Sequence, residues 1–315
     1  MSASALFLRA QDGVDLNLYH WPSPAAPRAV VMIAHGMAEH AARYQRLARQ
    51  LNQHGLSVYA LDQRGHGRSA DQGVLGHYAD DQGWNKVVSD LASLNRLIRQ
   101  RHGDTPVFLL GHSMGSYIGQ AYLMRHSTAV QGAILSGSNY QPLALYRAAR
   151  LIARFERWRL GPRGRSRLIN FLSFGAFNKA FKPARTEFDW LSRDAAEVDA
   201  YVTDPLCGFV CTTQLWCDLL DGLLDITPPA HLAQIDANLP VLVLGGSADP
   251  VSQGVRLEHL AEALRQAGLK QVTLQIYPEA RHEVFNECNR DEVINALCQW
   301  LDRQLDNPPS AKERP

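Results

Sequence analysis

The chain of 315 residues is long enough for one large domain or for a core with an insertion, and its 46% hydrophobic residues can supply a sizeable buried core. A formal net charge of +1 gives no overall attraction to nucleic acid or to anionic surfaces, so no nucleic-acid partner is expected. The first ten residues lack a basic segment, and no apolar run approaches about 18 residues, which predicts a cytoplasmic protein.

The five cysteines argue against a disulfide framework, because their number is odd and none of them forms a C-x-x-C motif. Each stands among apolar residues, which favours buried free thiols in a reducing compartment. They are Cys207, Cys211, Cys217, Cys288 and Cys298.

The first part of the chain alternates predicted strands and helices. Residues 6–10 and 14–20 flank a turn containing Asp-Gly and predict an antiparallel hairpin. Apolar runs predict buried strands at 29–34, 57–61, 107–110 and 131–136, and helices are expected at 44–54, 84–102 and 116–123. The alternation predicts an α/β protein with a mostly parallel central sheet flanked by helices.

From residue 139 to residue 238 the alternation disappears, and we expect an inserted helical cap. Residues 143–160 predict an amphipathic helix with Leu145, Ile152 and Phe155 on its apolar face. The sheet pattern resumes with strands at 240–245 and 271–277 and helices at 254–267 and 290–305. The expected organisation is a first core part at 1–138, the cap at 139–238, a second core part at 239–306, and a flexible tail at 307–315.

Gly111, Ser113 and Gly115 form a G-x-S-x-G motif between the predicted strand at 107–110 and the helix that follows. This order is typical of a nucleophile elbow, in which a sharp turn exposes the serine and glycines avoid collisions with the strand and the helix. His112 occupies the free position of the motif, so we expect it to pack behind the site. The context predicts that Ser113 is a nucleophile.

A serine hydroxyl needs a base to take its proton and a carboxylate to orient that base. Asp249 and His282 each follow a predicted strand, so both are expected at the same edge of the sheet as Ser113. The chain order Ser113, Asp249, His282 is the order found in α/β-hydrolases.

An oxyanion hole would need two backbone N–H donors. The residue after the nucleophile supplies one, which is Met114 here. The second is expected from Met37, because Gly36 lets the backbone turn toward the site.

With these motifs, over roughly residues 12–305, the chain resembles the monoglyceride lipase and lysophospholipase-like branch of the α/β-hydrolases, which includes serine aminopeptidase-like proteins. The resemblance rests on residues 35–40 (HGMAEH), 62–69, 111–115 and 280–283, and on Asp249. It implies the same nucleophile, acid, base and oxyanion amides, and a cap that covers an acyl-chain pocket. Ala38 departs from the family, which usually has glycine at this position.

Several other polar residues are expected to have structural roles. His35, His40 and His66 are predicted to brace loops through hydrogen bonds, and no convincing metal-ligand spacing or cofactor motif occurs. Asp62 and Arg64 are expected to brace the turn at 65–67. Glu283 and Glu287 could orient the segment of His282, but solvated surface is the favoured interpretation.

The predicted cap has an uneven charge distribution. Eight arginines lie early in the cap and six acidic residues lie later, and the favoured interpretation is a solvated helix face that pairs with the acidic group. The alternative is a basic amphipathic surface that contacts anionic lipid. The early group is Arg147, Arg150, Arg154, Arg157, Arg159, Arg163, Arg165 and Arg167, and the later group is Glu187, Asp189, Asp194, Glu197, Asp199 and Asp204.

The predicted function is hydrolysis of a single-chain acyl ester, such as a monoacylglycerol or a lysophospholipid, through an acyl-enzyme. Aminopeptidase or thioesterase activity could use the same three side chains. A ligand-binding protein without turnover is the alternative from another class.

Overall fold

The computed structural model describes residues 4–71 and 73–306, so the predicted tail at 307–315 lies outside the described residues. Its eight strands form a single sheet in the order β1-β2-β4-β3-β5-β6-β7-β8. The strands are β1 (Ser4–Arg9), β2 (Asp15–Trp21), β3 (Ala29–Ala34), β4 (Leu56–Leu61), β5 (Val107–His112), β6 (Gly132–Ser136), β7 (Val241–Gly246) and β8 (Val272–Tyr277).

The predicted hairpin and parallel sheet are confirmed. β1 pairs with β2 in antiparallel orientation, with Leu6 opposite Leu18, and β2 pairs with β4 in antiparallel orientation. The six strands β4, β3, β5, β6, β7 and β8, in their order in the sheet, are parallel to one another. The carboxyl ends of these strands therefore meet at one edge, where the loops of an α/β sheet carry functional side chains.

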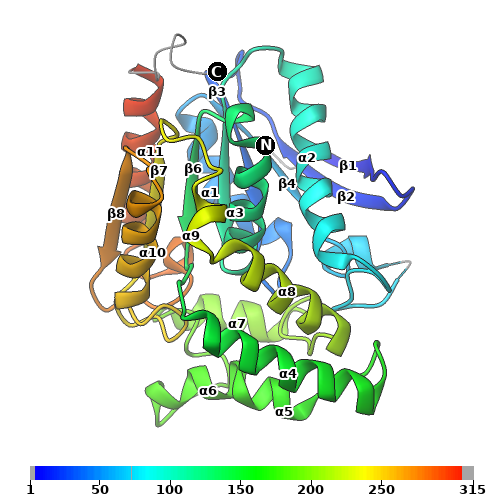
Figure 1. Ribbon diagram of the computed structural model, residues 1–315. Coiled ribbons are helices and arrows are strands. Elements are labelled where there is room, and N and C mark those ends of the chain that lie inside the picture. The colour runs from blue at the N-terminus through cyan, green and yellow to red at the C-terminus, as the bar shows by residue number, and fades with distance from the viewer. Residues whose placement is uncertain (1–3, 72, 307–315) are drawn as a thin grey trace.

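Helices cover both faces of the sheet and extend beyond one end of it (Figure 1). They are α1 (Gln45–Gln53), α2 (Gly83–His102), α3 (Met114–His126), α4 (Leu143–Leu160), α5 (Arg167–Leu172), α6 (Phe174–Phe177), α7 (Ala195–Thr203), α8 (Thr213–Ile226), α9 (Pro229–Leu232), α10 (Val255–Gln266) and α11 (Arg290–Asp306). Short 3-10 helices are η1 (Ala41–Tyr44), η2 (Gly67–Ala70), η3 (Ser127–Ala129), η4 (Asn178–Phe181) and η5 (Val284–Asn286).

The sheet separates two hydrophobic cores because successive side chains of a strand point to opposite faces. Val30 and Met32 of β3 belong to one core, with side chains of α2, α3, α8 and α10, whereas Val31 and Ile33 belong to the other, with side chains of α1 and α11. Every residue of β3 is buried, which explains why the strand reads as one continuous apolar run.

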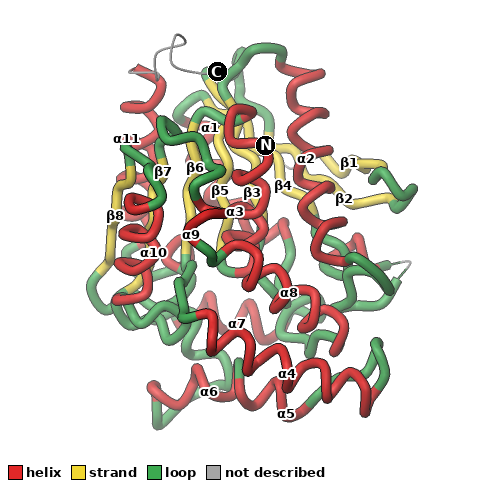
Figure 2. Tube along the Cα trace, viewed as in Figure 1, coloured by secondary structure: helices red, strands yellow, loops and turns green. Residues whose placement is uncertain are grey.

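The segment between β6 and β7 contains helices α4 to α9 and no strand among its described residues. Figures 1 and 2 show α4, α5, α6 and α7 together beyond one end of the sheet, while α8 reaches back along the core. α8 packs against α4 and also against α2 and α3, so it connects this helical layer to the core. No helix in the described part of the chain has the length and apolar character needed to span a membrane.

α4 differs from the usual amphipathic helix, because its apolar side chains are exposed. Leu151, Phe155 and Trp158 are 70%, 55% and 79% exposed, whereas Tyr146 and Ala153 on another face are buried. Burial of apolar area normally decides which face of a helix turns inward. The exposed apolar face therefore calls for a functional explanation.

All five cysteines are free thiols, but the prediction of burial is wrong for two of them. Cys211, Cys217 and Cys298 are buried, Cys207 is half-buried, and Cys288 is exposed. Cys288 lies in the turn between η5 and α11, where its immediate sequence neighbours are the polar residues Glu287 and Asn289.

Candidate active site

Ser113 lies between the end of β5 and the start of α3 in a backbone conformation that side chains rarely adopt. Its φ is 50° and its ψ is −121°, and its N–H donates to the carbonyl of Ser136 on β6 at 2.8 Å. A Cβ added to Gly111 would lie 2.5 Å from the carbonyl oxygen of Gly115, and one added to Gly115 would lie 2.0 Å from that of Ala34. The turn is too tight for side chains at either position, as the predicted elbow requires.

Asp249 and His282 come together from the loops after β7 and β8. Asp249 Oδ1 lies 3.0 Å from His282 Nδ1, and the two residues are only 1% and 2% exposed. Asp249 also accepts hydrogen bonds from Val251 N and Ser252 Oγ, each at 2.9 Å. The carboxylate is therefore fixed on both oxygens, and it fixes the imidazole in turn.

His282 has a pKa above its ordinary value. Burial alone would lower the pKa of this imidazole, but the nearby charge of Asp249 and its hydrogen bond outweigh burial. A base with a raised pKa accepts a proton more readily, which suits a group that must take one from a hydroxyl.

Ser113 and His282 both lie beside residues 136 and 137 at the end of β6, which places the serine next to this pair. A Cβ on Gly137 would lie 3.1 Å from His282 Cε1, and Gly137 follows Ser136, whose carbonyl receives the Ser113 N–H. Within residues 4–71 and 73–306, the Ser113 hydroxyl forms no hydrogen bond. Hydrogen bonds of catalytic groups are often long in the absence of substrate and tighten when it binds.

His112 packs behind this pair, with its ring centroid 4.9 Å from that of His282. Burial, followed by the charge of His282, lowers the pKa of His112 to about 4, so this imidazole is neutral near pH 7. Its Nδ1 lies 3.3 Å from Ser136 Oγ.

The loop after β3 presents the predicted oxyanion donor. The N–H of Gly36 donates to Glu39 Oε1 at 2.6 Å, whereas neither the Met37 N–H nor the Met114 N–H donates a hydrogen bond in the part of the chain described. A Cβ on Gly36 would lie 3.3 Å from the Cβ of Ser113, so this loop passes directly beside the nucleophile elbow. The two amides predicted to hold an oxyanion are thus free for that use.

Ala38 adopts φ 54°, the left-handed conformation that glycine tolerates best. Its carbonyl accepts hydrogen bonds from the N–H of Gly208 at 2.9 Å and from the hydroxyl of Tyr201 at 2.8 Å. Both donors belong to the helical layer between β6 and β7. This layer therefore holds the loop of Gly36 and Met37 in place.

A buried ion-pair network, which the sequence did not reveal, joins this loop to the segment of His282. Arg43 donates to Glu39 Oε2 at 2.7 Å and to both carboxylate oxygens of Glu283 at 2.6 and 2.7 Å. Glu39 also accepts from Tyr44 at 2.9 Å. The prediction that Glu283 is solvated surface is wrong, because Arg43 lies far away in sequence and its charge allows the carboxylate to be buried.

Glu287 is also buried, contrary to prediction, and is 0% exposed. Its oxygens accept from the N–H of Arg281 at 2.8 Å, and from the N–H and Nε of Arg193 at 3.1 and 2.9 Å. Glu287 thereby holds the residue before His282 and attaches it to the helical layer. The only hint in the sequence was its closeness to His282.

The histidines of the first two loops form the expected kinds of hydrogen bond. His35 Nε2 accepts from the N–H of Gln63 at 2.9 Å, and His66 Nδ1 lies 2.9 Å from the carbonyl of Arg64. Asp62 accepts from the N–H of Arg68 at 2.9 Å and so braces the turn at 65–67. The Arg64 guanidinium instead forms a buried ion pair with Asp90, at 2.6 Å. The main role of this side chain therefore differs from the predicted bracing of the turn.

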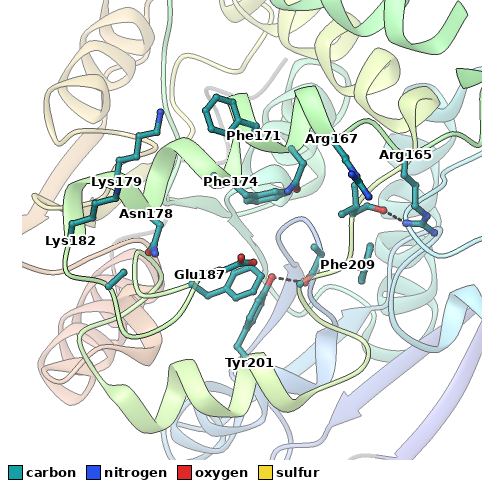
Figure 3. Close-up of a pocket in the computed structure, with 17 residues that line it drawn as sticks. Arg165, Arg167, Phe171, Phe174, Asn178, Lys179, Lys182, Glu187, Tyr201 and Phe209 are labelled. Atoms are coloured by element: carbon teal, nitrogen blue, oxygen red, sulfur yellow. Dashed lines mark hydrogen bonds between the residues drawn. The ribbon is translucent and has the colours of Figure 1, made fainter. Parts of the chain in front are cut away.

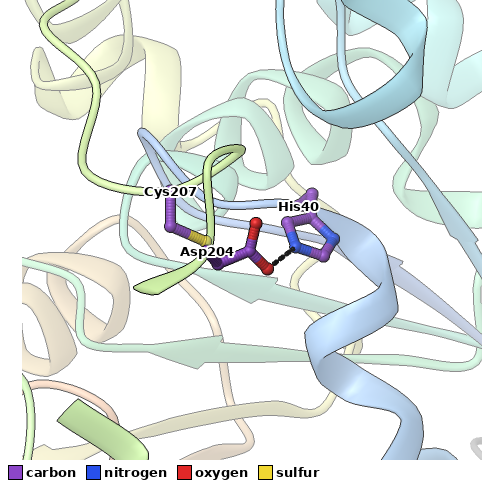
Figure 4. Close-up of side chains that lie close together, drawn as sticks. All are labelled: His40, Asp204 and Cys207. Carbon is purple, nitrogen blue, oxygen red and sulfur yellow. Dashed lines mark hydrogen bonds and ion pairs between the residues drawn. The ribbon is translucent and has the colours of Figure 1, made fainter. Parts of the chain in front are cut away.

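His40, Asp204 and Cys207 are the group of described residues that could together ligate a metal ion, with their donor atoms all within 4.8 Å of one another (Figure 4). His40 Nε2 is hydrogen-bonded to Asp204 Oδ2 at 2.8 Å, which accounts for the closeness of these two side chains. Burial raises the pKa of the Cys207 thiol, which disfavours the thiolate that metals bind. The group thus connects the loop after β3 to the segment after α7.

A cavity of about 680 Å³ lies within the helical layer and extends to Ala38 (Figure 3). Phe171, Phe174, Phe188 and Phe209 give it an aromatic lining. The ring of Phe174 lies 5.9 Å from that of Trp190, which in turn lies 5.0 Å from the ring of His282. The aromatic pair therefore stands between this cavity and the imidazole.

The early arginines and later acidic residues of this segment do not pair with one another among the described residues. The acidic residues contact other partners instead, as Glu197 does with Arg46 at 2.6 Å and Asp194 with Arg290 at 2.6 Å. Arg150 pairs with Asp221 of α8. The predicted pairing of the two groups is therefore wrong, whereas the predicted exposure to solvent is confirmed for most of the early arginines.

Comparison with known proteins shows extensive similarity. A family model described as "Serine aminopeptidase, S33" matches residues 25–289. Monoacylglycerol lipase of Mycolicibacterium smegmatis is 31% identical over 92% of this chain and 93% of its own length, and monoglyceride lipase of Mus musculus is 29% identical over 93% and 89%. The structure of a thermostable carboxyl esterase from Bacillus coagulans superposes with a TM-score of 0.89 at 24% identity, covering 97% of this chain and 99% of the esterase.

Proposed function

Because the chain belongs to the serine aminopeptidase S33 family of α/β-hydrolases, and to its monoglyceride lipase-like branch, we propose that it hydrolyses single-chain acyl esters such as monoacylglycerols with Ser113, His282 and Asp249. The observation that carries this proposal is the hydrogen bond of 3.0 Å between His282 and Asp249, beside a serine in elbow conformation. The helices between β6 and β7, within residues 139–238, act as the cap.

In the proposed reaction, Ser113 Oγ attacks the ester carbonyl while His282 takes its proton. Asp249 keeps the imidazole in the correct tautomer and stabilises its protonated form. The N–H groups of Met37 and Met114 receive the oxyanion, and His282 then returns the proton to the leaving alcohol. A water molecule, activated by the same imidazole, releases the carboxylic acid and restores Ser113.

Replacement of Ser113 by alanine tests this assignment. Turnover of a glyceryl ester should fall about a thousandfold or more, because the nucleophile is lost while binding remains. A fluorophosphonate probe should label the natural protein and not the variant. Near-normal turnover by the variant would refute the assignment, and failure to label the natural protein would favour a binding protein without turnover.

A chain-length series of p-nitrophenyl and glyceryl esters, with amide and thioester analogues, tests the type of bond. An aminopeptidase would have to accommodate the positive ammonium group of a peptide, but the cavity is lined by four cationic side chains and one carboxylate, that of Glu187. This charge distribution favours an ester substrate over a peptide. Faster cleavage of aminoacyl amides than of glyceryl esters would contradict the preference for esters.

We also propose that the cap contacts lipid surfaces through α4 and α5. Phe155 and Trp158 of α4 and Phe171 of α5 are 55%, 79% and 56% exposed, next to cationic side chains that include Arg154. Such a combination suits the interface of an anionic membrane. Flotation with anionic liposomes should capture the protein, and Trp158→Ala should reduce capture severalfold, whereas Phe7→Ala on β1 should not. Equal, negligible binding to neutral and anionic liposomes would end this proposal.

The proposed location is the cytoplasm. The supporting observation is that all five cysteines are free thiols, which is typical of proteins in reducing compartments.

A further inference from the structure

The cavity in the cap carries a concentration of positive charge that ester hydrolysis by itself does not require. Four cationic side chains line it, two on each side in Figure 3, and a single carboxylate, that of Glu187, faces them. The cationic residues are Arg165, Arg167, Lys179 and Lys182.

Two of these side chains are held by contacts with other parts of the protein. Arg165 donates to the carbonyl of Leu75 at 2.8 Å and also to that of Val210, so its guanidinium is fixed at the wall. The Lys179 ammonium lies 4.7 Å from the centre of the Phe171 ring. Neither contact removes the positive charge.

The protein itself does not neutralise the cavity. In the described part of the chain, Arg167 and Lys182 form no ion pair, and Glu187 pairs with none of the four cations. The net charge of the whole protein is only +1, so the excess at this cavity is local. The four cations and Glu187 are all exposed to solvent, and charges of one sign gathered around a cleft raise the local concentration of oppositely charged ligands.

From this charge excess we infer that the natural substrate is a single-chain acyl ester whose polar end carries a phosphate group. Arginine and lysine side chains are well suited to phosphate oxygens, and the aromatic walls suit the apolar part of the molecule. Ala38 lines the cavity and follows Met37 in the chain, so the cavity reaches the loop of the predicted oxyanion donor.

This inference rests on the proposed ester hydrolysis and specifies its substrate. One water molecule is consumed, the acyl–oxygen bond breaks, and the products are a free carboxylic acid and a phosphate-bearing alcohol. A zwitterionic head group should be accepted less well, because the same cations repel its ammonium.

The test compares three octanoyl esters below their critical micelle concentrations, so that no lipid surface is present. They are octanoylglycerol, octanoylglycerol phosphate and octanoylglycerophosphocholine. We expect kcat/KM for the phosphate monoester to exceed that for the neutral ester at least tenfold, and the ratio to fall as salt is added. An equal or greater kcat/KM for the neutral ester would overturn the inference.

Charge-reversal variants test whether the cations of the cavity cause the preference for the phosphate ester. Lys179→Glu combined with Lys182→Glu should reduce the ratio of kcat/KM for the phosphate ester to kcat/KM for the neutral ester at least tenfold. The matched control is Arg147→Glu with Arg154→Glu, which makes the same charge change on exposed residues of α4 outside the cavity. Equal effects of both pairs would attribute the preference to overall charge and refute the inference.

A binding measurement separates this inference from the proposed function. With Ser113→Ala, calorimetric titration should show tighter binding of octanoylglycerol phosphate than of octanoylglycerol. If the natural protein hydrolyses none of the three esters, the proposed function fails, while the calorimetric comparison still decides the charge preference. Equal affinities for the two ligands would refute it.

Discussion

Ala38 shows how a single residue can be held in an unfavourable conformation by its neighbours. Its φ of 54° costs an L-amino acid roughly 1–2 kcal/mol, and the hydrogen bonds that its carbonyl accepts from Tyr201 and Gly208 oppose that cost. The sequence identified the departure from glycine but not this pair of donors, because both come from a distant part of the chain.

Ala38→Gly should therefore raise the free energy of unfolding by at most about 1 kcal/mol, since relief of strain is partly offset by the greater entropy of the unfolded chain. Ala38→Val should lower it by roughly 1–3 kcal/mol, because a β-branched residue fits this conformation poorly. Urea unfolding of both variants measures these changes. Greater stability of the valine variant than of the glycine variant would contradict this interpretation.

His282 determines the expected pH dependence. The imidazole must be neutral to accept a proton, and its pKa is raised above the ordinary value of about 6.5. The value of kcat/KM should therefore fall with decreasing pH around a midpoint above about 6.5, rather than in the usual range of a free imidazole. Initial rates with a soluble ester across this range provide the test.

Circular dichroism at each pH serves as the control for loss of fold. A midpoint well below the ordinary histidine pKa, with the fold intact, would show that Asp249 does not raise the basicity of His282.

Among the elements, the link between the η1–α1 region and the segment of His282 depends on Arg43. This guanidinium bridges Glu39 and Glu283, and the charge of Arg43 holds the pKa of Glu39 below its ordinary value although burial alone would raise it. The sequence placed Asp249 and His282 correctly at strand ends because strand order determines that edge. It missed this bridge because no pattern along the chain relates position 43 to position 283.

Arg43→Met should destabilise the protein by about 3–5 kcal/mol, because two buried carboxylates would lose the positive charge that balances them. Arg46→Met is the matched control on the same helix region: its pair with Glu197 is 44% exposed on the arginine side, and its loss should cost less than about 1 kcal/mol. Chemical denaturation of both variants measures how much stability each one loses. Similar losses would mean that Arg43 acts as an ordinary surface charge.

For the whole molecule, the alternation of strands and helices was enough to predict the sheet, because buried parallel strands leave long apolar runs. The helical layer could be predicted only as helical. Its packing depends on contacts such as that of α8 with α2, and the exposed face of α4 contradicts the expectation that apolar faces turn inward. The cavity and its charges could not be inferred before these helices were placed.

The attachment of the helical layer to the core can be tested at Gly222. A Cβ there would lie 2.2 Å from Trp84 Cε2, so Gly222→Ala should force α8 away from α2 and cost roughly 1–3 kcal/mol, even though alanine favours helices. Gly175→Ala, whose Cβ would meet nothing closer than 3.6 Å, should change stability little. Thermal unfolding of both variants measures the difference, and equal melting temperatures would contradict close packing at Trp84.

The position of α8 has a further consequence. β6 and β7 are parallel neighbours, so the chain must cross from one end of the sheet to the other between them, and α8 makes that crossing while packed on α2 and α3. The helices α4 to α7 precede it as an excursion that contributes no strand. A change in the length or packing of this excursion would therefore leave the strand register and the serine turn in place.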